Sequence, residues 1–140
     1  MKITINKSDA RELMYESFCG GGLTELYYCD VIMGGENEEN YGKARHLLLG
    51  EGKTDICLED VYVKMLEEYG ILFMDENEDK KIHLTLGLAK ENIQKALDNK
   101  KTGAFVSAEI MKIIPKYDNA DAWTYFNVLQ LALFSEIIYG

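Results

Sequence analysis

The stretch from residue 119 to residue 138 constrains the fold most, because it reads as a helix that is apolar on nearly every side. Its apolar side chains form two adjacent rows, with Trp123, Phe126, Leu129, Leu133 and Ile137 in one and Val128, Leu131, Phe134 and Ile138 in the other. A helix without a polar face lies at the centre of a core or forms half of an interface. We therefore expect a structural helix, capped by Asn119 or Asp118 with Asp121 in its first turn, and a possible homodimer through it.

Two strand-like runs in the middle of the chain predict a β-hairpin. Residues 69–74 and 80–86 are rich in β-branched and aromatic side chains, and they flank an acidic stretch, 75–79. That stretch resembles the first half of a calcium-binding loop. The sixth position is Lys80 where such a loop needs Gly, and the twelfth is Leu86 where it needs Glu. We therefore expect a solvated hairpin tip rather than a calcium site.

Local patterns predict the remaining elements. We expect strands over 2–6, 23–33 and 54–60, and helices over 8–19, over 88–97 and from 104 to Pro115. Ser8 and Thr85 are the expected caps of the first two helices. Residues 34–40 are expected to form an exposed loop or the acidic start of a short helix that includes 41–49, followed by a turn at 50–52.

A run of three glycines, 20–22, follows a predicted helix rather than preceding one. Phosphate-binding glycines stand between a strand and the start of a helix, so we interpret these as a helix end and chain reversal. Strands concentrated early and helices late predict an α+β fold. It would have a small antiparallel sheet, an N-terminal helix and a C-terminal helical part, in one domain spanning 1–140.

Composition places the chain among globular proteins, with 47% hydrophobic and 28% charged residues in 140 positions. The start of the sequence lacks the apolar core of a signal peptide, and no apolar run has the length of a membrane span. Cys19, Cys29 and Cys57 are odd in number and widely spaced, which is typical of reduced thiols. We therefore expect a cytoplasmic protein that does not bind membranes.

Negative charge is concentrated in residues 36–79. This segment holds 13 acids and 4 bases, a net −9 that equals the charge of the whole chain, so direct nucleic-acid binding is disfavoured. The acids either form a solubilising surface or contact a basic groove of another protein. The candidates for partner contact are Glu36, Glu38, Glu39, Glu59, Asp60, Glu67, Glu68, Asp75, Glu76, Glu78 and Asp79.

No catalytic or metal-binding motif is visible in the sequence. His46 and His83 are the only histidines, and neither has Cys, Asp or Glu neighbours at a recognised ligand spacing. Serine-hydrolase, zinc-protease and Cys-x-x-Cys patterns are also missing. We therefore expect no enzyme, no metal and no cofactor.

Both ends of the chain resemble a family of small proteins from phages and prophages of Gram-positive and gut bacteria. The similar segments are 18–22, with its glycines, the pair Tyr27 and Tyr28, the lead-in 118–122 and the ending 127–140. Family members usually have Trp as the second aromatic residue and Gly in place of Ser135, and their glycines and aromatics stand closer together. The resemblance implies a phage origin and carries no functional residue, because no activity is established for the family.

Phage origin and an acidic surface together predict an inhibitor of a bacterial defence system, of the anti-CRISPR type, acting in the host cytoplasm. It would act without catalysis, by presenting carboxylates to the basic nucleic-acid-binding groove of a host defence protein such as a CRISPR effector. One alternative is a sponge for a nucleotide messenger, and another is a small phage structural or assembly protein. The sponge would bind phosphates with Lys90, Lys95, Lys100, Lys101, Lys112 and Lys116.

Overall fold

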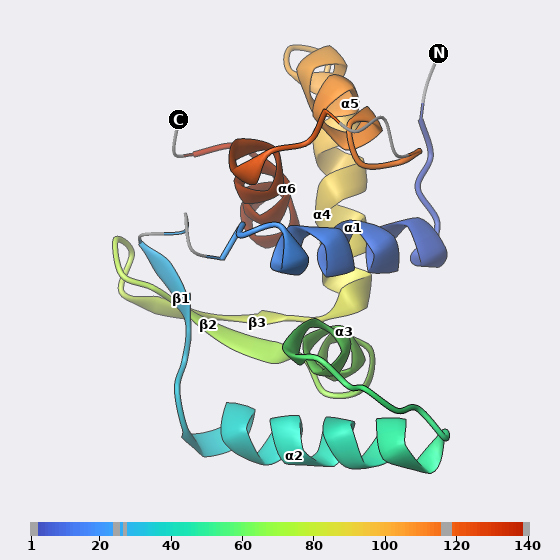
Figure 1. The fold of residues 1–140 in the computed structure, drawn as a ribbon. Coiled ribbons are helices and arrows are strands. Elements are labelled where there is room, and N and C mark those ends of the chain that lie inside the picture. The colour runs from blue at the N-terminus through green and yellow to red at the C-terminus, as the bar shows by residue number, and fades with distance from the viewer. Residues whose placement is uncertain (1–2, 24–25, 27, 116–118, 139–140) are drawn as a thin grey trace.

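The structure is a computed structural model that describes residues 3–23, 26, 28–115 and 119–138. These residues form six helices and one three-stranded antiparallel sheet, which confirms the α+β fold class (Figure 1). The elements are α1 Lys7–Cys19, β1 Cys29–Val31, α2 Gly35–Gly50, α3 Leu58–Glu68, β2 Ile71–Asp75, β3 Lys80–Leu84, α4 Leu86–Leu97, α5 Gly103–Met111 and α6 Ala122–Phe134.

Helix α1 crosses the middle of the molecule and packs between other helices. It contacts α3 on one side and α4 and α6 on the other, with α2 packed on the far side of α3. In Figure 1, α2 and α3 lie below α1, α5 and α6 lie above it, and α4 passes behind it. None of the helices in the described ranges has both the length and the apolarity needed to cross a bilayer.

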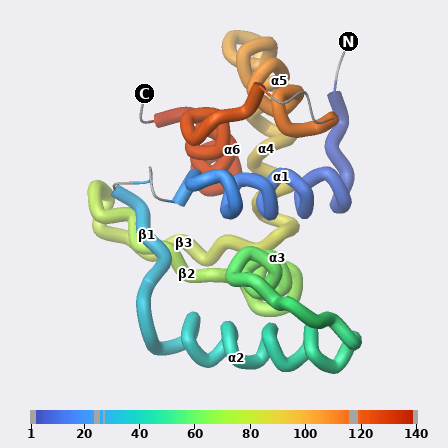
Figure 2. Tube along the Cα trace, in the orientation of Figure 1, coloured from blue at the N-terminus to red at the C-terminus, as the bar shows by residue number. Residues whose placement is uncertain are grey.

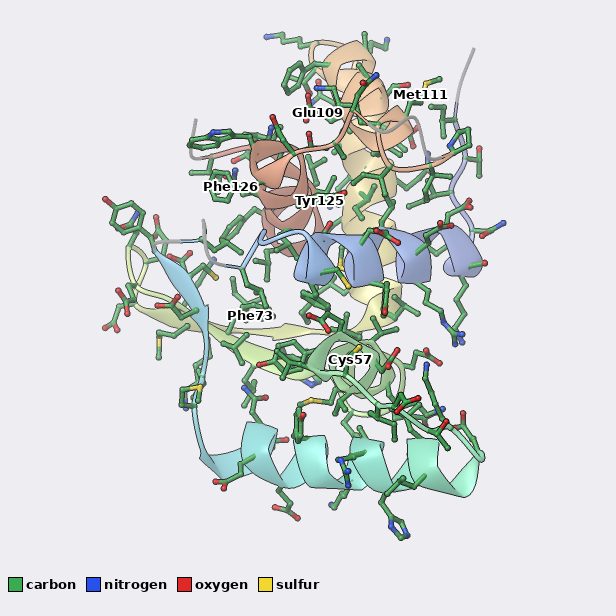
Figure 3. The ribbon with its side chains drawn as sticks, in the orientation of Figure 1. Cys57, Phe73, Glu109, Met111, Tyr125 and Phe126 are labelled. Atoms are coloured by element: carbon green, nitrogen blue, oxygen red, sulfur yellow. The ribbon has the colours of Figure 1, made fainter. Side chains whose placement is uncertain are left out.

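The predicted hairpin is confirmed as β2 and β3, joined by the acidic turn 76–79. The strands pair from Ile71 with Leu84 to Asp75 with Lys80, and β1 pairs with the other edge of β2. Ile71 and Phe73 are fully buried, whereas the alternate residues of β2 are half-buried. One sheet face therefore packs into the core, and Figure 3 shows Phe73 on β2 between the sheet and α1.

The predicted helices over 8–19 and 88–97 are confirmed as α1 and α4, with small differences at their ends. Thr85 caps α4 as expected, since its Oγ1 accepts the N–H of Leu88 at 3.1 Å. The cap of α1 is Asn6 rather than Ser8, because Asn6 and Asp9 each accept the other's backbone N–H. Helix α5 ends at Met111, before the predicted limit at Pro115.

The last helix is shorter than the predicted 119–138. Asp121 caps α6 by accepting the N–H of Thr124 at 3.0 Å, and Thr124 Oγ1 accepts the N–H of Asp121 in return. This reciprocal pair fixes the start of the helix, so Asn119 is not its cap. Asp118, the other predicted cap, lies outside the described residues.

Helix α6 lies at the centre of the core, as its apolar pattern predicts. Leu129 from one predicted row and Val128 and Leu131 from the other all have no exposed surface. Trp123 departs from its predicted apolar row, because its side chain is 55% exposed. Its ring packs edge-on against Phe126, with ring centroids 5.7 Å apart. Because the chain itself covers Val128 and Leu131, these side chains do not provide the apolar surface on which the homodimer was argued.

The predicted strand over 2–6 is wrong. Residues 3–6 belong to no strand, and Lys2 lies outside the described residues. The side-chain amide of Gln94 accepts the N–H of Ile5 at 2.9 Å and donates to the carbonyl of Ile3 at 3.0 Å. One glutamine on α4 thus satisfies backbone groups that a neighbouring strand would otherwise pair.

Two further strand predictions also fail in whole or in part. Of 23–33, only Cys29–Val31 forms a strand, and residues 24–25 and 27 lie outside the described part. The predicted strand 54–60 is instead a connection followed by α3, which Figure 2 traces from the end of α2. The carboxylate of Asp60 accepts the backbone N–H of Cys57 at 3.1 Å, and this helix-capping contact prevails over the alternating pattern.

The glycine run ends α1 and reverses the chain against α6, as predicted. Gly20 is the C-cap and Gly21 has a φ of 86°, a backbone conformation that favours glycine. A side chain at Gly20 would collide with the ring of Tyr125, and one at Gly22 would lie 2.8 Å from Leu129. Close packing against α6 therefore explains glycine at 20 and 22 without any phosphate.

Candidate protein-binding surface

The acids of the first turn of α2 are exposed. Residues 34–40 form the acidic start of a helix, the second of the two predicted alternatives. Glu36 and Glu38 make no ion pair with any described residue, whereas Glu39 pairs with Lys43 at 3.2 Å. Acids here also interact favourably with the positive end of the helix dipole. Glu36 and Glu38 are therefore available to a partner.

The hairpin tip supplies a second exposed acidic group, consisting of Glu76, Glu78 and Asp79. Asp75 is different, because it is only 3% exposed and its Oδ1 accepts the N–H groups of Asn77 and Glu78 at 3.1 and 3.3 Å. Its carboxylate organises the turn. This burial removes Asp75 from the predicted set of partner-contacting acids.

The segment 28–34, which includes β1, separates the two exposed acidic groups. The backbone N–H of Glu76 donates to the carbonyl of Tyr28, so the hairpin tip lies beside the residue that precedes β1. From Tyr28 to Gly34 the chain spans at most about 20 Å. An ordinary interface covers about 800 Å² on each partner, so one partner can contact both groups.

The acids of α3 mostly contact cations of the same chain. Glu67 pairs with Arg11 at 2.6 Å, and Asp60 pairs with Lys53 at 2.9 Å. Glu68 lies 3.8 Å from the amine of Lys64, and Glu59 is half-buried in the first turn of the helix. Of the predicted acids on α3, only Glu59 therefore lacks an ion pair with the described residues.

A cleft of about 500 Å³ lies between α1, α3 and the end of α2, and it is lined by the ion pairs of Glu67 with Arg11 and of Asp60 with Lys53. Its cations are Arg11, Lys53 and Lys64, and the last of these pairs with Glu51 at 2.6 Å. The hydrogen bond from Lys64 to Glu51 raises the pKa of the lysine above its ordinary value, although burial opposes this. Since every cation lining this cleft is paired with a carboxylate, the cleft is poorly suited to phosphate.

The described lysines among those predicted for a nucleotide sponge are distributed over α4, the C-terminal end of α5 and the connection between these helices. Lys90 and Lys95 line one shallow depression along α4, and Lys100 lines another at the start of α5, with Asp98 lining both. Lys101 is exposed next to Lys100. Lys112 pairs with the buried Glu109 at 3.0 Å, and Lys116 lies outside the described residues. Figure 3 shows Glu109 on α5, above α6.

The thiols have raised pKa values. Burial raises the pKa of Cys29 to about 12, and the nearby carboxylates of Asp75 and Asp30 add to this. Burial also raises the pKa of Cys57, although its Sγ contacts the hydroxyl of Tyr15 at 3.8 Å. Protonated thiols are poor nucleophiles. Among the described residues, no three His, Cys, Asp or Glu side chains are placed to hold a metal ion.

An apolar groove of about 430 Å³ lies between the start of α2 and α3. We call it the Met33 groove, and its walls include Val31, Met33, Tyr41, Leu58, Tyr62 and Met65. Met33 is 87% exposed and Leu58 is 47% exposed, so apolar surface faces solvent here. Glu38 also lines the groove and is exposed. An apolar centre beside charged residues is typical of protein interfaces.

Burial and ring packing hold the groove walls in place. Met65, which also lines the groove, is only 1% exposed. The ring of Tyr62 packs edge-on against Phe18 at 5.5 Å and against Tyr41 at 6.3 Å. Burial, and next the neighbouring Tyr41, raise the pKa of the Tyr62 hydroxyl, which stays neutral near pH 7.

Sequence reasoning identified the acids but missed the groove. Its lining comes from β1, α2 and α3, and the sequence predicted a strand where α3 begins. The only local signal is Met33, an apolar residue next to two glycines and an acidic stretch. Comparison with protein-family models, curated proteins and solved structures finds no match, so the functional argument depends on this geometry.

Proposed function

We propose that the protein is a non-enzymatic inhibitor that binds a basic surface of a bacterial defence protein in the host cytoplasm. One observation carries this proposal: exposed acids without ion pairs among the described residues stand beside an apolar groove that faces solvent. Glu36 and Glu38 lie at the start of α2, and Met33 precedes them. Such a surface offers charge for recognition and apolar area for affinity.

The chemistry of the acids favours a nucleic-acid-binding groove as the target. Lysine and arginine side chains that bind phosphates also bind carboxylates, through short charge-assisted hydrogen bonds. A negatively charged surface raises the association rate with such a groove, and its bound carboxylates exclude the phosphates of the nucleic acid. The similarity of both chain ends to phage proteins supports a host defence protein, such as a CRISPR effector, as the owner of that groove.

Charge reversal tests the proposal in cells. The experiment measures plating of a phage that the host defence restricts, with the protein supplied in the host. We expect Glu36→Lys with Glu38→Lys, and separately Glu76→Lys with Glu78→Lys, to reduce protection about tenfold or more. The matched control is Glu91→Lys with Glu136→Lys, two exposed acids on α4 and after α6.

Thermal melts of each variant accompany the plating assay, since substitutions at exposed sites change the free energy of unfolding by about 0.5 kcal/mol or less. Retained protection in both acidic variants would contradict the proposal. The same loss of protection in the control variant would also contradict it, because the effect would then depend on net charge rather than on this surface.

A further inference from the structure

We propose that the Met33 groove receives one aliphatic side chain from a basic segment of the partner protein, while lysines or arginines beside that side chain contact the acids of α2. This inference rests on the proposed function and names the occupant of its surface. It is argued from the shape of the groove, from its lining and from the sign of the charge at its edge.

Apolar and aromatic side chains make the groove suited to an aliphatic anchor. Met33 and Met65 are unbranched and polarizable, so they adapt to the shape of an inserted side chain. The Tyr41 and Tyr62 rings add flat apolar surface. A side chain inserted here would cover Met33, which is exposed to 87% in the free protein.

A buried amide fixes the geometry of the groove before any partner binds. Asn37, which also lines the groove, donates to the carbonyls of Ile32 and Leu72 at 2.8 Å each and accepts the N–H of Leu72 at 2.9 Å. These contacts tie the start of α2 to Ile32, directly after β1, and to β2. A preformed site loses little conformational entropy on binding, which favours insertion of a single side chain.

The charge at the edge of the groove selects a cationic segment. Glu38 lines the groove, and its carboxylate lies over Gly34 at the start of α2. Glu36 is exposed on the same first turn. The nearest lysine on this helix, Lys43, is already paired with Glu39. An anionic lipid or an acidic peptide would therefore meet like charge here, whereas a basic segment meets opposite charge.

Methionine methyl signals in nuclear magnetic resonance test the occupant directly. The protein carries ¹³C-labelled methionine methyl groups and is titrated with an acetylated peptide in which one leucine is flanked by lysines. We expect the methyl signals of Met33 and Met65 to shift and saturate at about millimolar peptide. The methyl of Met111, exposed on α5, serves as the internal reference and should not shift.

Two further peptides separate the anchor from the charge. Replacing the leucine by alanine should weaken binding about tenfold, because the apolar contact is lost. Replacing the lysines by glutamates should abolish the shifts. Equal binding of the leucine and alanine peptides would overturn the groove proposal and leave the acidic surface intact. Equal binding of the lysine and glutamate peptides would contradict both this inference and the proposed function.

Surface variants provide the matched control. Met33→Ser should weaken binding of the leucine peptide about tenfold and leave binding of the alanine peptide unchanged. Met111→Ser should leave the affinity for both peptides unchanged. Glu38→Gln should weaken binding of the leucine peptide and of the alanine peptide, both of which carry lysines, by about two- to fivefold. This is the range expected for the loss of an exposed ion pair. Unchanged affinity of the leucine peptide for Met33→Ser, with the fold shown intact by the remaining methyl signals, would also overturn the proposal.

Discussion

Asn37 is the residue that most clearly connects local structure to the candidate surface. Its amide makes three hydrogen bonds to the backbone of Ile32 and Leu72 while being only 6% exposed. Replacing it by leucine leaves two carbonyls and one N–H without these partners. We expect Asn37→Leu to lower the free energy of unfolding by about 3 kcal/mol, measured by urea denaturation.

Asn37→Asp is the conservative control for that experiment. Aspartate can still accept the N–H of Leu72, but as a carboxylate it cannot donate to the carbonyls of Ile32 and Leu72. The variant should therefore also be destabilised. A stability equal to that of the wild-type protein in both variants would show that the amide does not hold α2 against the sheet.

Asp60 makes stability depend on pH. Burial alone would raise its pKa, but hydrogen bonds from Lys53 and Cys57 outweigh burial and hold the pKa below the ordinary value of 3.8. The carboxylate therefore contributes stability above the ordinary pKa and loses that contribution as the pH falls through the lowered one. We expect Asp60→Asn to be less stable than wild type near pH 7 and the difference to shrink below about pH 4.

Chemical denaturation across this pH range measures the difference between the two proteins. Glu36→Gln, which removes an exposed negative charge, controls for the change in net charge. A stability difference between Asp60→Asn and wild type that stays constant from pH 7 to about pH 3 would contradict the prediction.

At the scale of elements, the sequence predicted those whose signal is local. The hairpin of β2 and β3 was predictable because strand-forming runs flank its acidic turn, and α4 because Thr85 precedes an apolar stripe. The start of α3 was not predictable from alternation, since Cys57 and Asp60 form a capping contact there. Likewise, the sequence of residues 3–6 has the pattern of a strand. Its backbone groups at Ile3 and Ile5 are instead paired with the side chain of Gln94, which is distant in the sequence.

Helix α6 gives an element-scale test of core packing. Leu129 has no exposed surface, so Leu129→Ala removes buried atoms and leaves a cavity in the middle of the core. We expect it to lower the free energy of unfolding by about 2–5 kcal/mol. Trp123 is on the same helix but is 55% exposed, so Trp123→Ala should lower the free energy of unfolding by less than Leu129→Ala. An unchanged melt of Leu129→Ala would contradict the central position of α6.

At the scale of the molecule, the acidic segment of the sequence and the lysines that follow it lie on different elements of the fold. The acidic segment 36–79 builds α2, α3 and the hairpin tip, whereas most lysines after residue 80 lie on or between α4 and α5. In Figure 1, α2 and α3 lie below α1 and α5 lies above it, while α4 passes behind α1. The sequence predicted the segments but not which acids stay exposed, because Asp60, Glu67 and Asp75 acquire their partners only through folding.

This separation predicts how the whole molecule responds to a cation without any apolar anchor. Backbone amide signals, recorded during titration with short oligolysine at low salt, should shift in the first turn of α2 and at the hairpin tip. They should stay constant along α4 and α5, where Lys90, Lys95 and Lys100 repel the probe. The shifts should diminish at about 0.15 M salt, where charges more than about 8 Å apart are largely screened. Equal shifts in the first turn of α2 and along α4 and α5 would mean that the acids act only through net charge. The start of α2 would then not be the contact surface.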